Sequence, residues 1–389
     1  MNNKKLTIAL ISIMLFVASA FASYAVFSNS PLTKKAIPVS LPKVSSNGTV
    51  VFDNSLPKTQ ACPINGVLYS TQQEAWWKLH RPLGVMIENS TDARPQSGIS
   101  FADVTYEAMA EGGITRFLNI YYCQDAPEVG PVRSARTVFV NLVSEYGSNP
   151  LYAHVGGANT SGPADALGQI SDYGWDSYND LNQFSIGFPT YWRDYTRLGH
   201  DVATEHTMYS TTTKLWDFAK ANRNLTNVDK DGKAWDTNFV PYTFADDAPA
   251  SQRPSSQSVH MEFGNGGSDY FVDWTYDPKT NLYMRANGGK SHIDLDTKKQ
   301  LSAKDVVVLF ESISNVDDGY ENSLHLLYGD KGTGKAVVFM NGKETKGTWK
   351  KISRTSRTQL FDANGSPIAF TRGKLWFDIL PLNGVLTVK

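Results

Sequence analysis

Three neighbouring stretches decide the fold of this chain: RPLGVMIENS (81–90), DVTYEAMAEGGITRFLNIYY (103–122) and GPVRSARTVF (130–139). Each contains an apolar run that stops at charged residues. The runs at 83–87, 104–108 and 114–122 are short, and the last is rich in β-branched and aromatic residues, which predicts buried strands. Side chains at strand ends reach solvent while the sheet holds them in place, and binding sites are built there. The region therefore predicts a sheet with a candidate site at its edge.

Helical and strand patterns alternate through the rest of the first half. Residues 135–146 and 211–222 have one apolar face, residues 163–170 begin with a proline suited to a first helical turn, and LYAHV (151–155) is a further strand. This alternation predicts an α/β or α+β domain at 59–244, with helices packed on a sheet. The polar segment 245–258 predicts a linker. Short strands with hairpin turns predict a β-rich second domain at 259–389.

The N-terminus carries a targeting signal at 1–27. Lys4 and Lys5 precede an apolar stretch of roughly 20 residues, which can span a bilayer with its start in the cytoplasm. Ala20-Phe21-Ala22 also fits a signal-peptidase site, so a transmembrane anchor and a signal peptide are both open, and the length favours the anchor. Both place the globular part outside the cytoplasm. The proline-containing segment 28–58 predicts a flexible spacer between this single-pass anchor in the cell membrane and the first domain.

Composition narrows the class of protein. Lys and Arg (37) nearly balance Asp and Glu (38), so the basic excess of a nucleic-acid binder is missing and no such partner is expected. The two cysteines, Cys62 and Cys123, are expected to form a disulfide in an exported chain, with two independent thiols as the alternative. The sequence contains no metal-ligand spacing and no nucleotide fingerprint, so we expect neither a metal nor a cofactor.

Two arginines mark the candidate site. Arg133 and Arg136 flank the start of the helix predicted at 135–146, with Ser134 as a fair N-cap. Cations there oppose the helix dipole by roughly 0.3–1 kcal/mol each. Two interpretations are open. The arginines and the free helix N–H groups bind an anion, or the arginines pair with nearby acids such as Glu107 and Glu111.

Further polar residues end the neighbouring strands. Glu107 and Glu111 could act as acid and base or bind a divalent cation, or they are turn residues held by amides and arginines. His154, at the end of 151–155, is a candidate acid, base or ligand, or a half-buried structural residue. The catalytic candidates are thus Glu107, Glu111 and His154. The ligand-binding candidates are Glu88, Asn89, Arg94, Arg116, Arg133, Arg136 and His206.

At RPLGVMIEN, ARPQSG, ADVTYEAMAEGGITRF, GPVRSAR and HTMYS, the chain resembles the YerB-like family of bacterial exported lipoproteins. The second half resembles it in NLYMRANGGKSHID, GKAVVFMNGKETKGTWKK, LFDANGSPI and GKLWFDILP. The resemblance implies a membrane-tethered extracytoplasmic protein with an α/β first domain and a β-rich second domain. It implies no established activity, cofactor or catalytic residue. The family's lipid-modified cysteine is missing here, which favours the transmembrane anchor.

The function that these features favour is binding. A cleft lined by the charged residues of the first domain would recognise an anionic or glycan-type ligand of the cell envelope, such as a cell-wall polymer. Aromatic residues are frequent at 173–195 and could stack on sugar rings, or could pin a long loop to itself. A hydrolase using Glu107 or Glu111 with His154 is the alternative. A scaffold whose β-rich domain docks an envelope protein is the third hypothesis.

Overall fold

The computed structural model describes residues 3–28, 39–45, 49–264 and 266–389. It has two compact units, Met1–Ser40 and Leu41–Lys389. In the first unit, helix α1 (Asn3–Ser28) covers most of the predicted anchor. Residues 29–38 and 46–48 of the predicted spacer lie outside the described residues. Across the described ranges, every helix falls short of the length and apolarity that a bilayer crossing requires.

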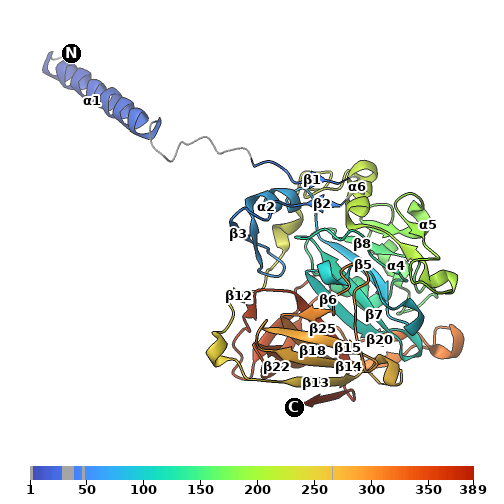
Figure 1. Cartoon of the computed structure of the whole chain (residues 1–389). Helices are drawn as coiled ribbons and strands as arrows, with labels where there is room; N and C mark the ends of the chain where they lie inside the picture. The colour runs from blue at the N-terminus through green and yellow to red at the C-terminus, as the bar shows by residue number, and fades with distance from the viewer. Residues whose placement is uncertain (1–2, 29–38, 46–48, 265) are drawn as a thin grey trace. The chain divides into compact units, whose positions relative to one another are not determined.

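A mixed sheet of ten strands is the centre of the second unit (Figure 1). Five adjacent strands come from the second half of the chain and five from the first. Their order across the sheet is β23 (Gln359–Asp362), β22 (Lys343–Lys351), β21 (Gly332–Met340), β18 (Asp305–Glu311), β25 (Leu375–Pro381), β6 (Val104–Met109), β7 (Thr115–Tyr121), β5 (Leu83–Glu88), β8 (Leu151–His154) and β9 (Asp180–Asn182).

The predicted fold class is confirmed, because the first half combines helices with strands and the second half is rich in strands. The two halves also share the sheet: β25 pairs in parallel with β6, with Phe377 opposite Tyr106. Near the segment 245–258, β12 (Phe244–Ala245) pairs with β24 (Phe370–Thr371). The halves are therefore joined through backbone hydrogen bonds within one compact unit.

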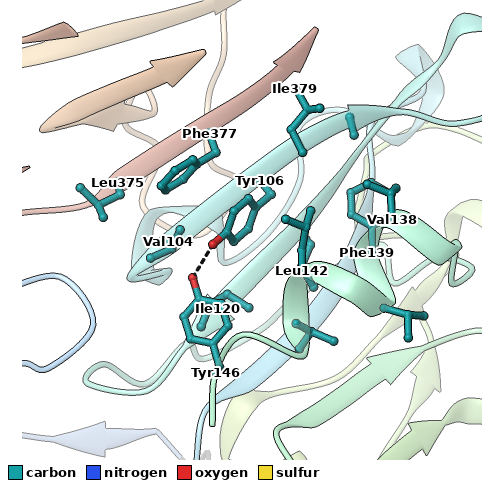
Figure 2. Packing of buried hydrophobic residues seen from close by; sticks show 14 of the residues in the cluster. Val104, Tyr106, Ile120, Val138, Phe139, Leu142, Tyr146, Leu375, Phe377 and Ile379 are labelled. Atoms are coloured by element: carbon teal, nitrogen blue, oxygen red, sulfur yellow. Dashed lines mark hydrogen bonds between the residues drawn. The ribbon is translucent and has the colours of Figure 1, made fainter. Parts of the chain in front are cut away.

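Helices cover one face of the sheet. They are α2 (Thr71–Trp77), α3 (Thr137–Val143) and α4 (Ala166–Asp172), and each adds buried side chains to one continuous core. In this core Tyr106 and Phe377 stack across the joint between the halves, with ring centroids 4.9 Å apart. The hydroxyl groups of Tyr106 and Tyr146 lie 2.8 Å apart, so both buried phenols have a partner (Figure 2).

A second sheet and one helix supply the buried side chains of the opposite face. The helix is α6 (Thr212–Arg223). The second sheet contains β16 (Lys290–Ser291), β15 (Leu282–Asn287), β14 (Val272–Asp277), β13 (Ser258–Glu262) and β26 (Val385–Val388), with β17 (Ser302–Ala303) beside β15. Its side chains Trp274 and Tyr283 share a core with Trp376 of the ten-stranded sheet. The molecule therefore buries both faces of the central sheet.

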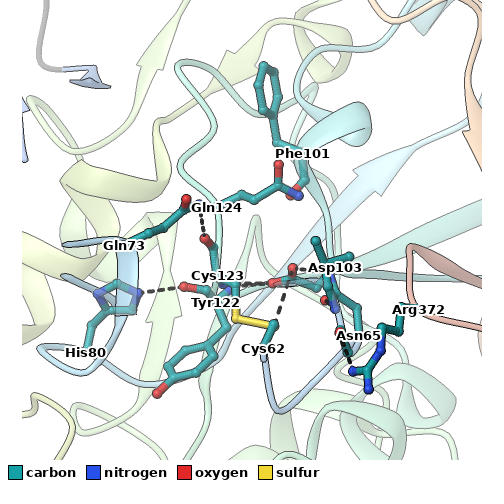
Figure 3. The surroundings of a disulfide bond; sticks show 12 residues. Cys62, Asn65, Gln73, His80, Phe101, Asp103, Tyr122, Cys123, Gln124 and Arg372 are labelled. Carbon is teal, nitrogen blue, oxygen red and sulfur yellow. Dashed lines mark hydrogen bonds between the residues drawn. A yellow bond between two sulfur atoms is a disulfide. The ribbon is translucent and has the colours of Figure 1, made fainter. Parts of the chain in front are cut away.

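The disulfide between Cys62 and Cys123 is confirmed. It links the segment after β3 (Lys58–Ala61) to the end of β7, and both cysteines are buried. Beside it, Asp103 accepts hydrogen bonds from the backbone N–H groups of Tyr122 (2.8 Å) and Cys123 (2.9 Å) (Figure 3). The bridge therefore ties the segment that precedes the sheet to the sheet itself.

Candidate functional site

The topology gathers several predicted residues at one edge of the central sheet. Strands β5 and β6 both run antiparallel to β7, so they are parallel to each other, and β8 is parallel to β5. The carboxyl ends of β5, β6 and β8 consequently meet at the amino end of β7. There Arg116 lies opposite Glu88 of β5 and opposite Ala108 of β6.

Five charged residues form what we call the arginine cluster: Glu88, Glu111, Arg116, Arg133 and Arg136. Arg136 makes a two-pronged contact with Glu111, in which Nη2 donates to Oε2 at 2.6 Å and Nε donates to Oε1. Arg116 Nη2 lies 3.8 Å from Glu111 Oε2, and Arg133 Nε lies 3.3 Å from Glu88 Oε1. The cluster thus holds three guanidinium groups and two carboxylates.

Electrostatics within the cluster favour a further anion. Arg116 is 7% exposed, and its Nε has no hydrogen-bond partner among the described residues. Burial, reinforced by the charge of Arg136, lowers the pKa of Arg116 to about 9. Burial alone would raise the pKa of Glu111, but the hydrogen bond and charge of Arg136 and the charge of Arg116 lower it to about 2. Glu205, a further acid, is close enough to Arg133 for their charges to interact.

The helix after the cluster begins later than the sequence predicts. The first residue of α3 is Thr137, its N-cap is Arg136, and no side chain caps it. Ser134 is therefore not the cap; its backbone carbonyl accepts a hydrogen bond from Arg116 Nη1 at 3.2 Å. With a helix of only seven residues, an anion at this edge would be held by the guanidinium groups.

Two predicted histidines have different surroundings. His206 joins the cluster, because its Nδ1 lies 2.9 Å from Glu88 Oε2. His154 is fully buried, with Nε2 2.6 Å from Asp180 Oδ1 and Nδ1 2.7 Å from the carbonyl oxygen of Gly156. Both ring nitrogens of His154 therefore already face protein acceptors. Its geometry is that of a structural, fully hydrogen-bonded residue rather than of an open acid or base.

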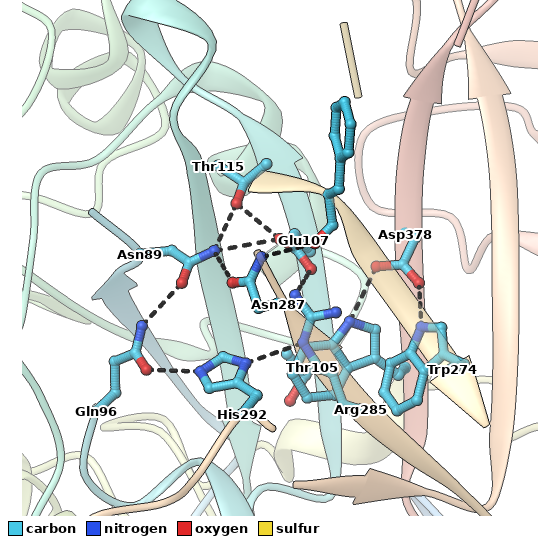
Figure 4. Close-up of polar contacts among 12 residues, drawn as sticks. Asn89, Gln96, Thr105, Glu107, Thr115, Trp274, Arg285, Asn287, His292 and Asp378 are labelled. Carbon is cyan, nitrogen blue, oxygen red and sulfur yellow. Dashed lines mark hydrogen bonds and ion pairs between the residues drawn. The ribbon is translucent and has the colours of Figure 1, made fainter. Parts of the chain in front are cut away.

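The remaining candidates belong to a separate buried network between the two sheets (Figure 4). Glu107 is fully buried and accepts hydrogen bonds from Arg285 Nη2 at 2.6 Å and from Thr115 Oγ1 at 2.7 Å. Asn89 Nδ2 donates to Thr115 Oγ1 and to Asn287 Oδ1. Side chains alternate along β6, so Tyr106 and Ala108 face the helices and Glu107 faces the second sheet. Glu107 therefore does not belong to the arginine cluster.

No motif or periodicity in the sequence marks several members of this network as site residues. Arg285 Nε donates to His292 Nδ1 at 3.1 Å, and His292 Nε2 lies 2.7 Å from Gln96 Oε1. Burial and the charge of Arg285 hold the pKa of His292 well below its usual value. Burial and then Glu107 raise the pKa of Asp378 well above its usual value. Glu107 and Arg285 are thus the ion pair of this network, with His292 and Asp378 beside it.

Arg94 links this network to the surface. Its Nε donates to Asn89 Oδ1 at 3.0 Å and its Nη1 to the carbonyl oxygen of Asp269 at 2.9 Å. Burial and the charge of Arg285 lower the pKa of Arg94. Arg94 also lines a pocket of about 370 Å³ with His292 and Lys290. The predicted residues therefore separate into the arginine cluster, the buried network and the His154 pair.

Replacing Glu111 by Gln should remove an acid-sensitive part of the stability. The folded pKa of Glu111 is about 2 and its ordinary value is 4.5, so its contribution is full above pH 4.5 and is lost as the pH falls toward 2. The difference corresponds to about 3 kcal/mol. Urea unfolding of both proteins between pH 2 and pH 7 measures it. Parallel pH profiles for the wild type and E111Q would contradict the assignment, because other acids titrate equally in both.

Fold and site together define a two-part protein in which an α/β half and a strand-rich half share one sheet that ends in a charged edge. Residues 69–226 match the N-terminal domain, and residues 259–377 the C-terminal domain, of a family described as "Protein of unknown function (DUF3048)". The chain belongs to this YerB-like family. It is 28% identical over 326 residues to "Putative lipoprotein YerB" of Bacillus subtilis (strain 168), covering 83% of this chain and 87% of the relative.

A solved structure shows the same fold. The crystal structure of YerB protein from Bacillus subtilis matches with a TM-score of 0.68 and 24% identity, covering 85% of this chain and all of that one. Both cysteines of the present chain form the disulfide. Neither is therefore available for the lipid attachment that the relative's name implies for that protein.

Proposed function

We propose that this protein is held at the outer surface of the cell membrane and binds an anionic or glycan-type ligand of the cell envelope at the arginine cluster. The observation that supports this most is the gathering of three guanidinium groups at the same ends of neighbouring strands. Arg133 has the most exposed side chain of the five, at 27%. A carboxylate or phosphate approaching Arg133 would form a charge-assisted hydrogen bond with it.

Two further features support the location. Lys4 and Lys5 precede the apolar residues of α1, which is the arrangement of an anchor that starts in the cytoplasm. The disulfide is typical of proteins outside the reducing cytoplasm. The similarity to a protein named "Putative lipoprotein YerB" also supports an exported chain that is attached to the membrane.

The geometry gives less support to the hydrolase hypothesis. Glu111 is held by Arg136, Glu107 is enclosed with Arg285, and His154 is bonded at both ring nitrogens. An acid or base that works on a substrate must reach it within hydrogen-bond distance. Each of the three side chains would first have to break a buried contact, so binding is the better-supported activity.

Removal of the Arg133 side chain tests the proposal. The full-length protein, purified in detergent, is sedimented with peptidoglycan sacculi that retain their phosphate-bearing polymers. We expect R133A to bind about tenfold more weakly, because one charge-assisted contact is lost. Glu88 keeps its contact with His206 in this variant, so the fold should persist, and thermal melting checks this.

The control is Lys346→Ala, which removes one exposed cation from β22, where Lys346 is 72% exposed. It loses the same net charge, so it reports the non-specific part of binding. Equal binding by R133A and K346A would overturn the proposal. If the ligand is the phosphate-bearing polymer, its extraction with acid should abolish the difference in binding between wild type and R133A. If the difference persists, the ligand is the glycan strand.

A further inference from the structure

A larger pocket lies away from the arginine cluster, at the opposite end of α3. Its volume is about 630 Å³, within the range of small-molecule sites. Arg136 is the N-cap of α3, whereas this pocket begins at Ser144, the C-cap. Its walls come from the turn at 147–150, from the aromatic residues after α4, and from the turn between β22 and β23. Both halves of the chain therefore contribute to it.

The charged side chains that line this pocket are mostly basic. Four of them are cations and one is an acid: Lys233, Lys350, Arg354, Arg357 and Asp229. Aspartate 229 is a turn residue that accepts hydrogen bonds from the backbone N–H groups of Asp231 and Lys233. The pocket therefore favours a negatively charged occupant.

Arg357 is a buried cation in the wall of the pocket. It is 5% exposed, and its guanidinium carbon lies 4.2 Å from the ring centroid of Tyr242 and 4.5 Å from that of Tyr146. Glu145 Oε2 lies 3.6 Å from Nη1, which is within ion-pair range but too long for a hydrogen bond. The Glu145 carboxylate instead accepts hydrogen bonds from Lys351 Nζ and from the hydroxyl group of Thr358. Arg357 is therefore held by aromatic rings and by the charge of Glu145, and it adds positive charge to the wall of the pocket.

Arg354 is held in place by aromatic residues. Its guanidinium carbon lies 3.8 Å from the ring centroid of Tyr173 and 5.6 Å from that of Trp175. Its Nη1 donates to Ser144 Oγ at 2.7 Å. These contacts fix the guanidinium group before any ligand arrives, which lowers the entropy cost of binding. Arg354 can therefore present a fixed guanidinium group to an anion in the pocket.

We propose that this pocket binds a sugar unit that carries a carboxylate or phosphate group. Arg354 takes the charged group, and Lys233, Lys350 and Arg357 add positive charge around it. The neutral polar side chains of the walls (Ser148, Asn149, Asn238, Gln359) suit sugar hydroxyl groups. The exposed apolar side chains Ile352 and Val240 suit the C–H face of a ring. This site is separate from the arginine cluster and does not depend on the function proposed there.

The test is calorimetric titration of the full-length protein with soluble sugars. The probes are glucuronic acid and glucose 1-phosphate, with neutral glucose and inorganic phosphate as comparisons. We expect the charged sugars to bind and glucose not to. R354A should weaken binding about tenfold or more. R354K, which keeps the charge but loses the planar fork, should also weaken it, and K346A, which lies outside the pocket lining, should not.

Several outcomes would overturn this proposal. The first is no heat of binding with either charged sugar at millimolar concentration. The second is unchanged binding in both R354A and R354K while melting shows both to be folded. The third is inorganic phosphate binding as tightly as glucose 1-phosphate, which would reduce the pocket to a plain anion site. Because the probes are soluble and the sacculi are absent, failure here leaves the arginine cluster proposal standing, and the converse also holds.

Discussion

Replacing Arg285 by Met is expected to lower the free energy of unfolding by about 3–5 kcal/mol, the usual cost of removing one partner of a buried ion pair. Arg285 and Glu107 are both fully buried, and Nη2 donates to Oε2 at 2.6 Å. Without Arg285, the carboxyl group of Glu107 is left buried beside that of Asp378 with no cationic partner. Urea unfolding at pH 7 of R285M and wild type measures the loss.

The double variant E107Q/R285M separates charge from shape. It removes the unpaired carboxylate while methionine keeps apolar contact with Trp376, over which the guanidinium carbon lies at 4.7 Å from the ring centroid. We therefore expect the double variant to be more stable than R285M alone. The matched control is R372M, which breaks a partly exposed pair with Asp246 and should cost at most about 1 kcal/mol. Equal losses for R285M and R372M would show that burial of the pair contributes nothing.

This network also shows where sequence reasoning stops. In β15 the alternation is reversed: Tyr283, Arg285 and Asn287 are buried, while Leu282 and Met284 are half-buried. A polarity pattern would place the two apolar residues inward. The inward arginine is explained only by Glu107, 178 positions away. Pairing across two sheets leaves no local periodicity, so neither Arg285 nor His292 could be predicted.

The strands and the charged residues near their ends could be predicted from the sequence, because the signal for each strand is local. Strand β5 ends at Glu88, β6 is followed closely by Glu111, and β7 begins with Thr115 and Arg116. Each apolar run therefore has a polar residue at or near the end that reaches the site, and that end can be located without knowing the neighbouring strands. That Arg116, Arg133 and Arg136 gather with Glu88 and Glu111 follows from these ends once β5 and β6 are parallel.

The sequence could not predict which acid or base each site residue would contact. From the sequence, Glu107 and Glu111 are both possible partners of the arginines in the cluster, but only Glu111 has this role, because Glu107 faces the second sheet. His154 is bonded to Asp180 on β9, a strand of three residues that is too short for a periodic signal. The arginines at 354 and 357 lie in a turn, where no periodicity marks a buried side chain.

Loss of the disulfide is expected to lower the free energy of unfolding by about 4 kcal/mol, since it closes a long loop in the unfolded chain. Cys62 and Cys123 are 61 positions apart. The variant C62A/C123A should show this loss against the oxidised wild type in urea unfolding. Alanine is the better replacement than serine, because both positions are buried and a serine hydroxyl would need a partner.

Reduction supplies the matched control for this prediction. Wild type unfolded in the presence of dithiothreitol should approach the stability of C62A/C123A, and the variant itself should not respond to the reductant, because the chain has no other cysteine. The remaining difference between reduced wild type and variant then reports packing of the two thiols alone. If oxidised wild type and C62A/C123A differ by less than about 1 kcal/mol, the unfolded chain already keeps residues near 62 and 123 together, and the loop-closure argument fails for this protein.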